Sequence, residues 1–529
     1  MTEPHLAMRG GQAISGHSDA RAAPPGPAAD SPALAGTVPD EPFRMRAVLV
    51  LRRHWLVLAL LAAGVMARAA TQIAYHPALI YIDSLKYLYG EWPGADPLGY
   101  RVLLKLILTV GDLGTVTVLQ HLLGLAAAVA LYVVLLRRGV SRWLAALAVA
   151  PVLLDAYQLQ MEHMIMPDVW FEAMVAAGLA VLLWRPGVSW PAAAAAGLIL
   201  GSSATVRQVG EVLVVPAVLY LLTAGGGWRH VIGRGAVLVV AFALPILGYS
   251  SVSYARTGHF WLAAGQGSAP GRLAAAADCA TLKLPAAAAP LCPTPGEQAR
   301  GPDWLEHSGE SPLHTAVIPP GTSRAALISD LRTAVERQQP VRVVASVLHD
   351  SLHLFTVTRR GSPGGTPISR WQFQAGYPTY FPQVTVGSGH VIVLGLQRRV
   401  YGPFRHRTLS PSYGGPAQVD RPVAAFLRSY QLDGGFTPGP LLALCVLAGL
   451  TGSALVLARG ARGARSRQLA RACLLFTATA AVVLLVPDAF EFSWRYQLPA
   501  LITLPPAGVL GLSAVFRYRQ RDQAGDQIG

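Results

Sequence analysis

The chain alternates between apolar stretches and short polar segments along most of its 529 residues. Each apolar stretch is close to twenty residues long, the length of helix that crosses a hydrocarbon core of about 30 Å. We therefore expect ten spanning helices. Spans one, two, three, five and seven are predicted at about 47–70, 115–136, 143–159, 191–206 and 235–254. Spans four, six, eight, nine and ten are predicted to end near Arg185, Trp228, Arg459, Asp488 and Arg517.

Charge divides the connecting segments into two kinds. Segments before span one and after each even-numbered span are basic, whereas the other turns are acidic. Lys and Arg accumulate in short cytoplasmic loops, so both termini are expected in the cytoplasm and the acids outside, with the plasma membrane as the location. The acidic turns contain Asp83, Glu91, Asp96, Glu162, Asp168, Glu211, Asp488 and Glu491.

This pattern predicts an all-α polytopic membrane protein in five regions. Residues 1–42 are rich in Ala, Pro, Gly and Ser and are expected to form a disordered cytoplasmic tail. A seven-span module with the active site (43–254) precedes a mixed extracytoplasmic domain (255–436). A three-span module (437–516) and a second cytoplasmic tail (517–529) complete the chain. Helices are expected at about 323–338 and 341–357 within the extracytoplasmic domain.

Composition agrees with the membrane class. Only 13% of the residues are charged and 52% are hydrophobic, whereas a soluble domain has about 25% charged residues. The net charge of +15 could suggest nucleic acid as a partner. The arginines, however, cluster between apolar segments as membrane topology requires, so we expect membrane lipids as partners and no nucleic acid.

Four cysteines are present. Cys445 and Cys473 lie in apolar segments and are expected to be inert core residues. Cys279 and Cys292 are close together in the segment placed outside, where the compartment is oxidising. We predict a disulfide between them.

Asp83 follows span one, among aromatic and aliphatic residues near the membrane surface. A carboxylate in such surroundings needs a partner or a function. Partial burial would raise its pKa toward the working range of a general base. The alternative is that Asp83 only caps a helix, since Asp is favoured at that position.

A second cluster lies between spans three and four. Glu162, His163 and Asp168 occur within seven residues, which is more ionisable groups than a short turn requires. Asp168 also fits the first turn of a helix, where the dipole stabilises an acid. We favour Glu162 as the functional acid over Asp168 and predict His163 as a substrate-lining residue.

Two arginines depart from the charge rule. Arg207 at the outer end of span five and Arg495 before span ten are both placed outside. A guanidinium binds phosphate through two parallel charge-assisted bonds, so we predict these arginines as phosphate ligands. Gln208 and Tyr496 follow them and are predicted to line the substrate site. The alternative is that the arginines extend to the membrane interface.

Acids and arginines on one face of the membrane suit a transferase that takes a sugar from a lipid phosphate. A base accepts a proton from the acceptor hydroxyl, and cations stabilise the departing phosphate. Because arginines can neutralise a single phosphate, no cofactor is required, with a divalent cation kept as an alternative. No Cys/His metal-ligand spacing is present.

The sequence resembles the GT-C class of integral-membrane glycosyltransferases, in the branch of the protein mannosyltransferases and the aminoarabinose transferase. The resemblance is carried by Asp83 after span one, the acidic turn 162–168, the seven-span module and the late segment FSWRYQLPALITLPPAG. It implies a polyprenyl-phosphate-linked sugar donor, an inverting hexosyl or pentosyl transfer at the outer face, and Asp83 as the base. Many members have paired acids in the first loop, whereas Ser84 follows Asp83 here.

Two other functions are compatible with a polytopic chain. A transporter or flippase of a lipid-linked sugar or glycan would have ionisable residues near the middle of its spans. A non-catalytic scaffold would leave Asp83, Glu162 and Arg207 scattered. Neither the sugar nor the acceptor, which could be a glycan, a lipid or a protein, follows from the sequence.

Overall fold

The structure of the protein is a computed structural model that describes residues 51–89, 96–223, 227–263, 269–359, 366–377, 384–387, 390–393, 414, 417–457 and 464–526. The predicted disordered tail, residues 1–42, lies outside these residues. The chain divides into two units, residues 1–53 and residues 54–529, and the second contains every feature described below.

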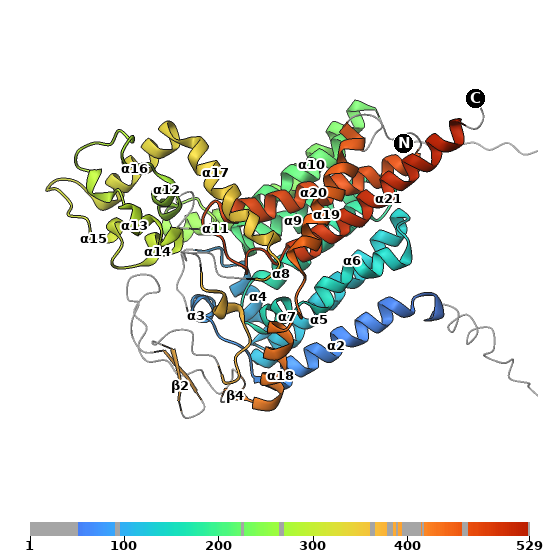
Figure 1. Cartoon of the computed structure of the whole chain (residues 1–529), viewed down its shortest axis with the longest axis horizontal. Coiled ribbons are helices and arrows are strands. Elements are labelled where there is room, and N and C mark those ends of the chain that lie inside the picture. Colours follow the sequence, from blue (N-terminus) through green and yellow to red (C-terminus); the bar gives the residue numbers. More distant parts are fainter. Residues whose placement is uncertain are drawn as a thin grey trace, which may run out of the picture. The chain divides into compact units, whose positions relative to one another are not determined.

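Five helices of the described residues are long and apolar enough to cross a membrane. The protein is therefore a multi-pass membrane protein. These helices run in similar directions (Figure 1). They are α2 (Trp55–Ala74), α5 (Leu113–Arg138), α11 (Trp228–Thr257), α20 (Ala464–Asp488) and α21 (Ala500–Asp526), of which residues 500–517 form the apolar part.

A bent pair of helices follows α5. α6 (Arg142–Leu154) and α7 (Ala156–His163) meet at an angle of 50° and count as a sixth span if they cross together. The bend occurs at Asp155, whose side chain accepts a hydrogen bond from the Tyr157 N–H and so caps α7. An Asp at this position satisfies a backbone donor that the new helix leaves free.

The remaining predicted spans fall on shorter helices. They are α8 (Asp168–Leu183), α9 (Trp190–Val206), η1 (Gln208–Leu213) with α10 (Val214–Thr223), and α19 (Gly439–Leu457). Each of the ten predicted stretches is thus helical. Length and composition support five or six spans among the described residues, so the count of ten and its sidedness stay predictions.

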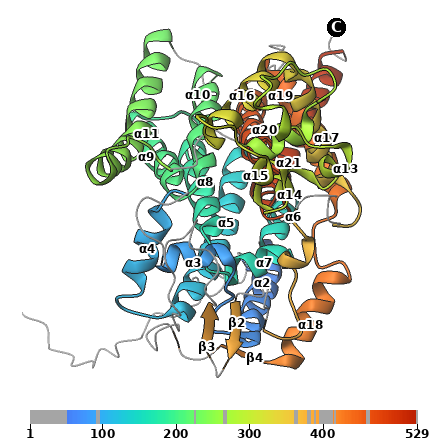
Figure 2. The same ribbon diagram turned by 90° about the vertical axis from the view of Figure 1, so that its left-hand side faces the viewer.

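Short elements connect the ends of these helices. Figure 2 shows α3 (Ile82–Tyr89) and α4 (Gly99–Ile107) next to each other, beneath α8 and α9. β1 (Tyr75–His76) pairs with β4 (Gln418–Val419), and β2 (Val384–Gly387) pairs with β3 (His390–Val393), both antiparallel. The first pairing joins the end of α2 to a segment more than 300 residues later.

Residues 255–436, expected as one domain, do not share one core. α12 (Pro270–Ala276), η2 (Ala289–Leu291), α13 (Pro295–Gln298), α14 (Gly301–His307), α15 (Pro312–Thr315) and α16 (Arg324–Gln338) lie together (Figure 1). They pack around a core of their own that includes Leu291, Leu305 and Leu331. α17 (Pro340–Ser351) leads from them to α20.

The later part of this region packs instead on the helix bundle. It comprises η3 (Leu352–Phe355), η4 (Ile368–Trp371) and α18 (Arg421–Leu432). Trp371, Phe373 and Leu427 belong to the core of the spanning helices. A polar segment can thus take part in the membrane module when its aromatic side chains are buried there.

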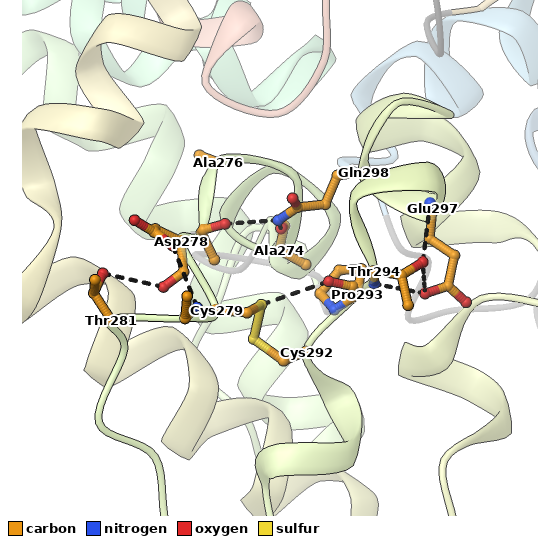
Figure 3. The surroundings of a disulfide bond; sticks show 12 residues. Ala274, Ala276, Asp278, Cys279, Thr281, Cys292, Pro293, Thr294, Glu297 and Gln298 are labelled. Atoms are coloured by element: carbon orange, nitrogen blue, oxygen red, sulfur yellow. Dashed lines mark hydrogen bonds between the residues drawn. A yellow bond between two sulfur atoms is a disulfide. The ribbon is translucent and has the colours of Figure 1, made fainter.

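A disulfide joins Cys279 and Cys292, thirteen residues apart (Figure 3). The side-chain amide of Gln298 donates to the carbonyls of Ala274 and Ala277 at 3.0 and 2.6 Å. The disulfide and these bonds hold the segment after α12 against the segment that leads into α14.

Candidate active site

A cavity of about 390 Å³ lies where several connections meet. α3, the junction between α9 and η1, the connection from α20 to α21, and helices α12 and α14 all contribute lining residues. Elements from both predicted membrane modules and from the region between them therefore surround one space of the size that small ligands occupy.

Ion pairs link the charged side chains at the inner part of this cavity. Arg495 Nη1 donates to Asp83 Oδ2 at 2.7 Å, and Arg495 Nε and Nη2 donate to the Asp168 carboxylate at 3.1–3.2 Å. Arg207 also donates to Asp168, and Lys86 lies 3.4 Å from Asp83 Oδ1. The structure thus brings together four predicted residues, namely Asp83, Asp168, Arg207 and Arg495.

Local structure places each of these groups at the end of an element. Asp168 is the first residue of α8, where its carboxylate is stabilised by the N-terminal dipole. Arg207 ends α9 in an extended conformation, so its side chain leaves the helix axis. Arg495 lies in the turns between α20 and α21. Asp83 is in the first turn of α3 and not at its N-cap.

Charge and burial set the state of the groups at this site. Burial raises the pKa of Asp83, but Lys86 and Arg495 outweigh that effect and hold it well below the ordinary range. The Asp83 side chain is 21% exposed, whereas that of Asp168 is 1% exposed. Asp83 is therefore the ionised carboxylate that a ligand can reach, and Asp168 is enclosed by its two arginines.

Gln208 and Tyr496 line the same cavity. The guanidinium carbon of Arg207 lies 5.1 Å from the centre of the Tyr496 ring, and that of Arg495 lies 5.5 Å from it. Cations over an aromatic ring are attracted to its face. Tyr496 therefore helps to hold the two arginines beside each other.

Glu162 and His163 do not line this cavity; they belong to a separate buried network. Arg68 Nη2 donates to Glu162 Oε1 at 2.6 Å, and His121 Nδ1 lies 3.0 Å from Glu162 Oε2. His121 Nε2 and His163 Nδ1 are 3.2 Å apart, and His163 Nε2 lies 2.6 Å from the carbonyl oxygen of Tyr75. Glu162 and His163 are both fully buried.

The close packing of this network depends on a glycine. A side chain on Gly124 of α5 would overlap the Glu162 carboxylate. α5 can therefore approach α7 closely enough for His121 to contact Glu162. This network connects α2, α5 and α7 in the interior of the bundle.

Other charged side chains and one histidine line the cavity without having been predicted as site residues. They are Lys86, Asp96, Glu211, Arg272, Asp303, Glu306, His307 and Glu491. Of these, Asp96, Glu211 and Glu491 stood out in the sequence only as acids of outside turns. Arg272, Asp303 and His307 lie in the long polar region, where no local spacing marks a site.

A metal site requires several ligand side chains that converge on one point. Among the described residues, no group of three or more His, Cys, Asp or Glu side chains could hold a metal ion. Asp83 and Asp168 are both paired with Arg495. The divalent-cation alternative stays a prediction.

A second, larger cavity of about 960 Å³ lies between α6, α19 and α21. Its wall is mainly apolar, with Leu147, Leu441 and Val509 among the lining residues, and Asp155 and Asp433 also reach it. The Asp155 carboxylate is paired with Arg359 at 2.7 Å. An apolar space between spanning helices suits a hydrocarbon chain.

No protein-family model matches the sequence, and neither does any curated protein. Three solved structures of membrane glycosyltransferases are similar in fold. The chain is 14% identical to a protein O-mannosyltransferase complex of S. cerevisiae bound to its sugar donor, over 39% of this chain and 34% of that one, with a TM-score of 0.32. It is 11% identical to the oligosaccharyltransferase AglB of Archaeoglobus fulgidus, in complex with an inhibitory peptide and a dolichol phosphate, over 90% and 52%, with a TM-score of 0.40.

The third is ArnT of Cupriavidus metallidurans in the apo state, 14% identical over 87% of this chain and 77% of that one, with a TM-score of 0.32. The chain spans about a third of the mannosyltransferase chain and about half of the oligosaccharyltransferase chain. All three are GT-C glycosyltransferases, the class that the sequence motifs resemble.

Proposed function

We propose that the protein is a membrane glycosyltransferase that moves a sugar from a polyprenyl-phosphate carrier to an acceptor at the outer face of the plasma membrane. The observation that carries this proposal is that Asp83, Arg207 and Arg495 line one cavity, while the buried Asp168 pairs with both arginines. A reachable carboxylate beside two guanidinium groups provides a base and a phosphate site within a few ångströms.

The reaction is a single displacement with inversion at the anomeric carbon, for a hexosyl or a pentosyl donor. The acceptor hydroxyl oxygen bonds to that carbon while the bond from the carbon to the phosphate oxygen breaks. The electron pair leaves with the phosphate, whose charge Arg207 and Arg495 stabilise. The hydroxyl proton passes to the Asp83 carboxylate.

Binding of the donor changes the partners of Arg495. The Arg495 Nη1 group donates a hydrogen bond to Asp83, and a bound phosphate would compete with the Asp83 carboxylate for that N–H group. Asp83 would then lose part of the positive field that lowers its pKa, and its basicity would rise when the substrate is present. Asp168 keeps Arg495 and Arg207 in place through this exchange.

A lipid carrier also needs room for its chain. The apolar cavity between α6, α19 and α21 supports a lipid substrate, because its wall matches a hydrocarbon chain. The acceptor could be a glycan, a lipid or a protein, and the chemistry requires only a hydroxyl that reaches Asp83.

The donor site is tested by binding of undecaprenyl phosphate to the full-length protein in lipid nanodiscs. We expect Arg495→Met to weaken binding at least tenfold relative to the wild type, since a charged phosphate contact is lost. The exposed Arg300→Lys variant serves as the control and should bind as the wild type does. Equal affinity in Arg495→Met would contradict the donor site.

A further inference from the structure

The side of the cavity formed by α12 and α14 carries polar groups that the transfer chemistry does not use. These groups, here called the rim, are Arg272, Asp303, Glu306, His307 and Glu491, with Phe490 beside them. The Cys279–Cys292 disulfide cross-links the segment that connects α12 to α14 (Figure 3). The two helices that carry rim residues are therefore joined by a cross-linked segment.

Arg272 is the deepest member of the rim. The residue is 2% exposed, and its Nη1 donates to Asp350 Oδ2 at 2.5 Å and to Ser346 Oγ at 3.1 Å. Its Nε and Nη2 have no hydrogen-bond partner among the described residues. Both atoms are themselves buried, and buried N–H groups without a partner are costly, so a ligand that reaches Arg272 from the cavity would satisfy them.

The other members combine donors with acceptors. His307 Nδ1 lies 3.2 Å from Asp303 Oδ1, and that interaction raises the pKa of His307 to about 9. Burial raises the pKa of Glu491 to about 8, with the neighbouring Asp303 carboxyl acting in the same direction. At neutral pH the rim therefore offers a carboxylate, an imidazolium, a carboxylic acid and a guanidinium.

Phe490 adds an apolar surface to this set. It is 42% exposed and lines the cavity, although it belongs to a connection that is otherwise packed into the bundle. Aromatic side chains with a few convergent polar groups are common in sites for small polar ligands.

We propose that the rim is the acceptor site and that the acceptor is a neutral carbohydrate; this inference rests on the proposed transferase function. Each sugar hydroxyl both donates and accepts a hydrogen bond, which matches a rim with free donors and a carboxylate acceptor. The cations Arg272 and His307 are paired with the acids Asp350 and Asp303, and Glu306 adds another acid, so the rim carries charges of both signs. These acids would repel an anionic acceptor, and Arg272 would repel a cationic one.

The test measures binding of α-mannobiose, a neutral disaccharide, to the full-length protein in lipid nanodiscs. We expect Arg272→Lys to weaken binding about tenfold, because Lys keeps the charge but loses the planar Nε and Nη2 donors. Phe490→Leu, which leaves every ion pair intact, should also weaken it. Arg300→Lys, an exposed residue outside the cavity, is the matched control and should bind as the wild type does.

The inference is overturned if α-mannobiose does not bind, or if it binds equally to wild type, Arg272→Lys and Phe490→Leu. Tighter binding of a digalacturonate or of a serine-containing peptide than of α-mannobiose would also overturn it. Undecaprenyl phosphate is titrated into the same samples. Donor binding that depends on Arg495 without any sugar binding at the rim would reject the rim alone. Sugar binding through Arg272 without donor binding would reject the transferase.

Discussion

Two networks in this protein use the same kinds of side chain in different ways. Beside the cavity, Arg495 joins Asp83 and Asp168, and the Asp83 side chain remains 21% exposed. In the bundle interior, Arg68 joins Glu162, and neither side chain is more than 3% exposed. Both lie near the ends of spanning helices, and both contain an acid from the turn between the predicted spans three and four.

The difference lies in what surrounds the ion pair. The cavity network keeps a space beside its charges, so a substrate can exchange with a side chain. The interior network has no such space: Arg68 also donates to the Leu153 carbonyl at 2.9 Å, and the missing side chain of Gly124 lets α5 close against Glu162. An enclosed pair of this kind holds helices together, and breaking it leaves a buried charge uncompensated.

The largest expected effect comes from the exposed carboxylate. Asp83→Asn should lower sugar transfer from polyprenyl-phosphate donors by about 10²–10⁴-fold, because the amide cannot accept the proton. Transfer is measured with purified protein in proteoliposomes, and membrane insertion should be unchanged. Asp330→Asn, an exposed acid on α16, is the control. Full transfer by Asp83→Asn would remove Asp83 from the role of base.

A substitution in the interior network should lower the stability of the protein and leave its transfer activity unchanged. Glu162→Gln should lower the free energy of unfolding by about 3–5 kcal/mol, since Arg68 loses its buried partner. The exposed Arg332–Glu336 pair gives a control, in which Glu336→Gln should change stability by less than about 1 kcal/mol. Thermal unfolding and transfer per folded molecule are both measured. Normal stability with lost transfer would assign Glu162 to catalysis and erase the contrast between the two networks.

A smaller effect is expected for Arg207, one of the two arginines that pair with Asp168. Arg207→Lys should raise the donor KM about tenfold with a smaller change in kcat, because Lys keeps a charge but cannot make two parallel bonds. Initial rates at varied donor concentration measure both constants. A donor KM equal to that of the wild type would leave phosphate binding to Arg495 alone.

The smallest effect concerns pH. Glu491 has a pKa of about 8 in the folded protein against an ordinary 4.5, so between these values the folded state holds a proton that the unfolded state releases. The stability that this proton provides is present below pH 4.5 and is lost as the pH rises through 8. The unfolding temperature of Glu491→Gln should therefore fall less between pH 5 and 9 than that of the wild type. Parallel pH profiles would mean that Glu491 is ionised in the folded state.

The sequence by itself determined the class of the protein and much of its helical layout. Apolar stretches of spanning length and low charge content require a membrane, and the described part of each of the ten predicted stretches is helical in the structure. Arg207 and Arg495 stood out because they depart from the pattern of basic inside segments, and Asp83 because it lies among apolar residues. These signals are local, so they can be read from spacing alone.

Only the tertiary structure decided which candidates share a site. Glu162 and Asp168 are six residues apart, yet the first faces Arg68 and His121 in the interior while the second faces Arg495 and Arg207 beside the cavity. The bend before α7 and the start of α8 set these directions, and partners between 39 and 327 residues away complete them. The roles of Arg272, Asp303 and Glu491 depend in the same way on how α12, α14 and the connection from α20 to α21 meet around the cavity. Long-range packing of this kind leaves no periodic mark in the sequence, because each partner is chosen by position in space and not by spacing along the chain.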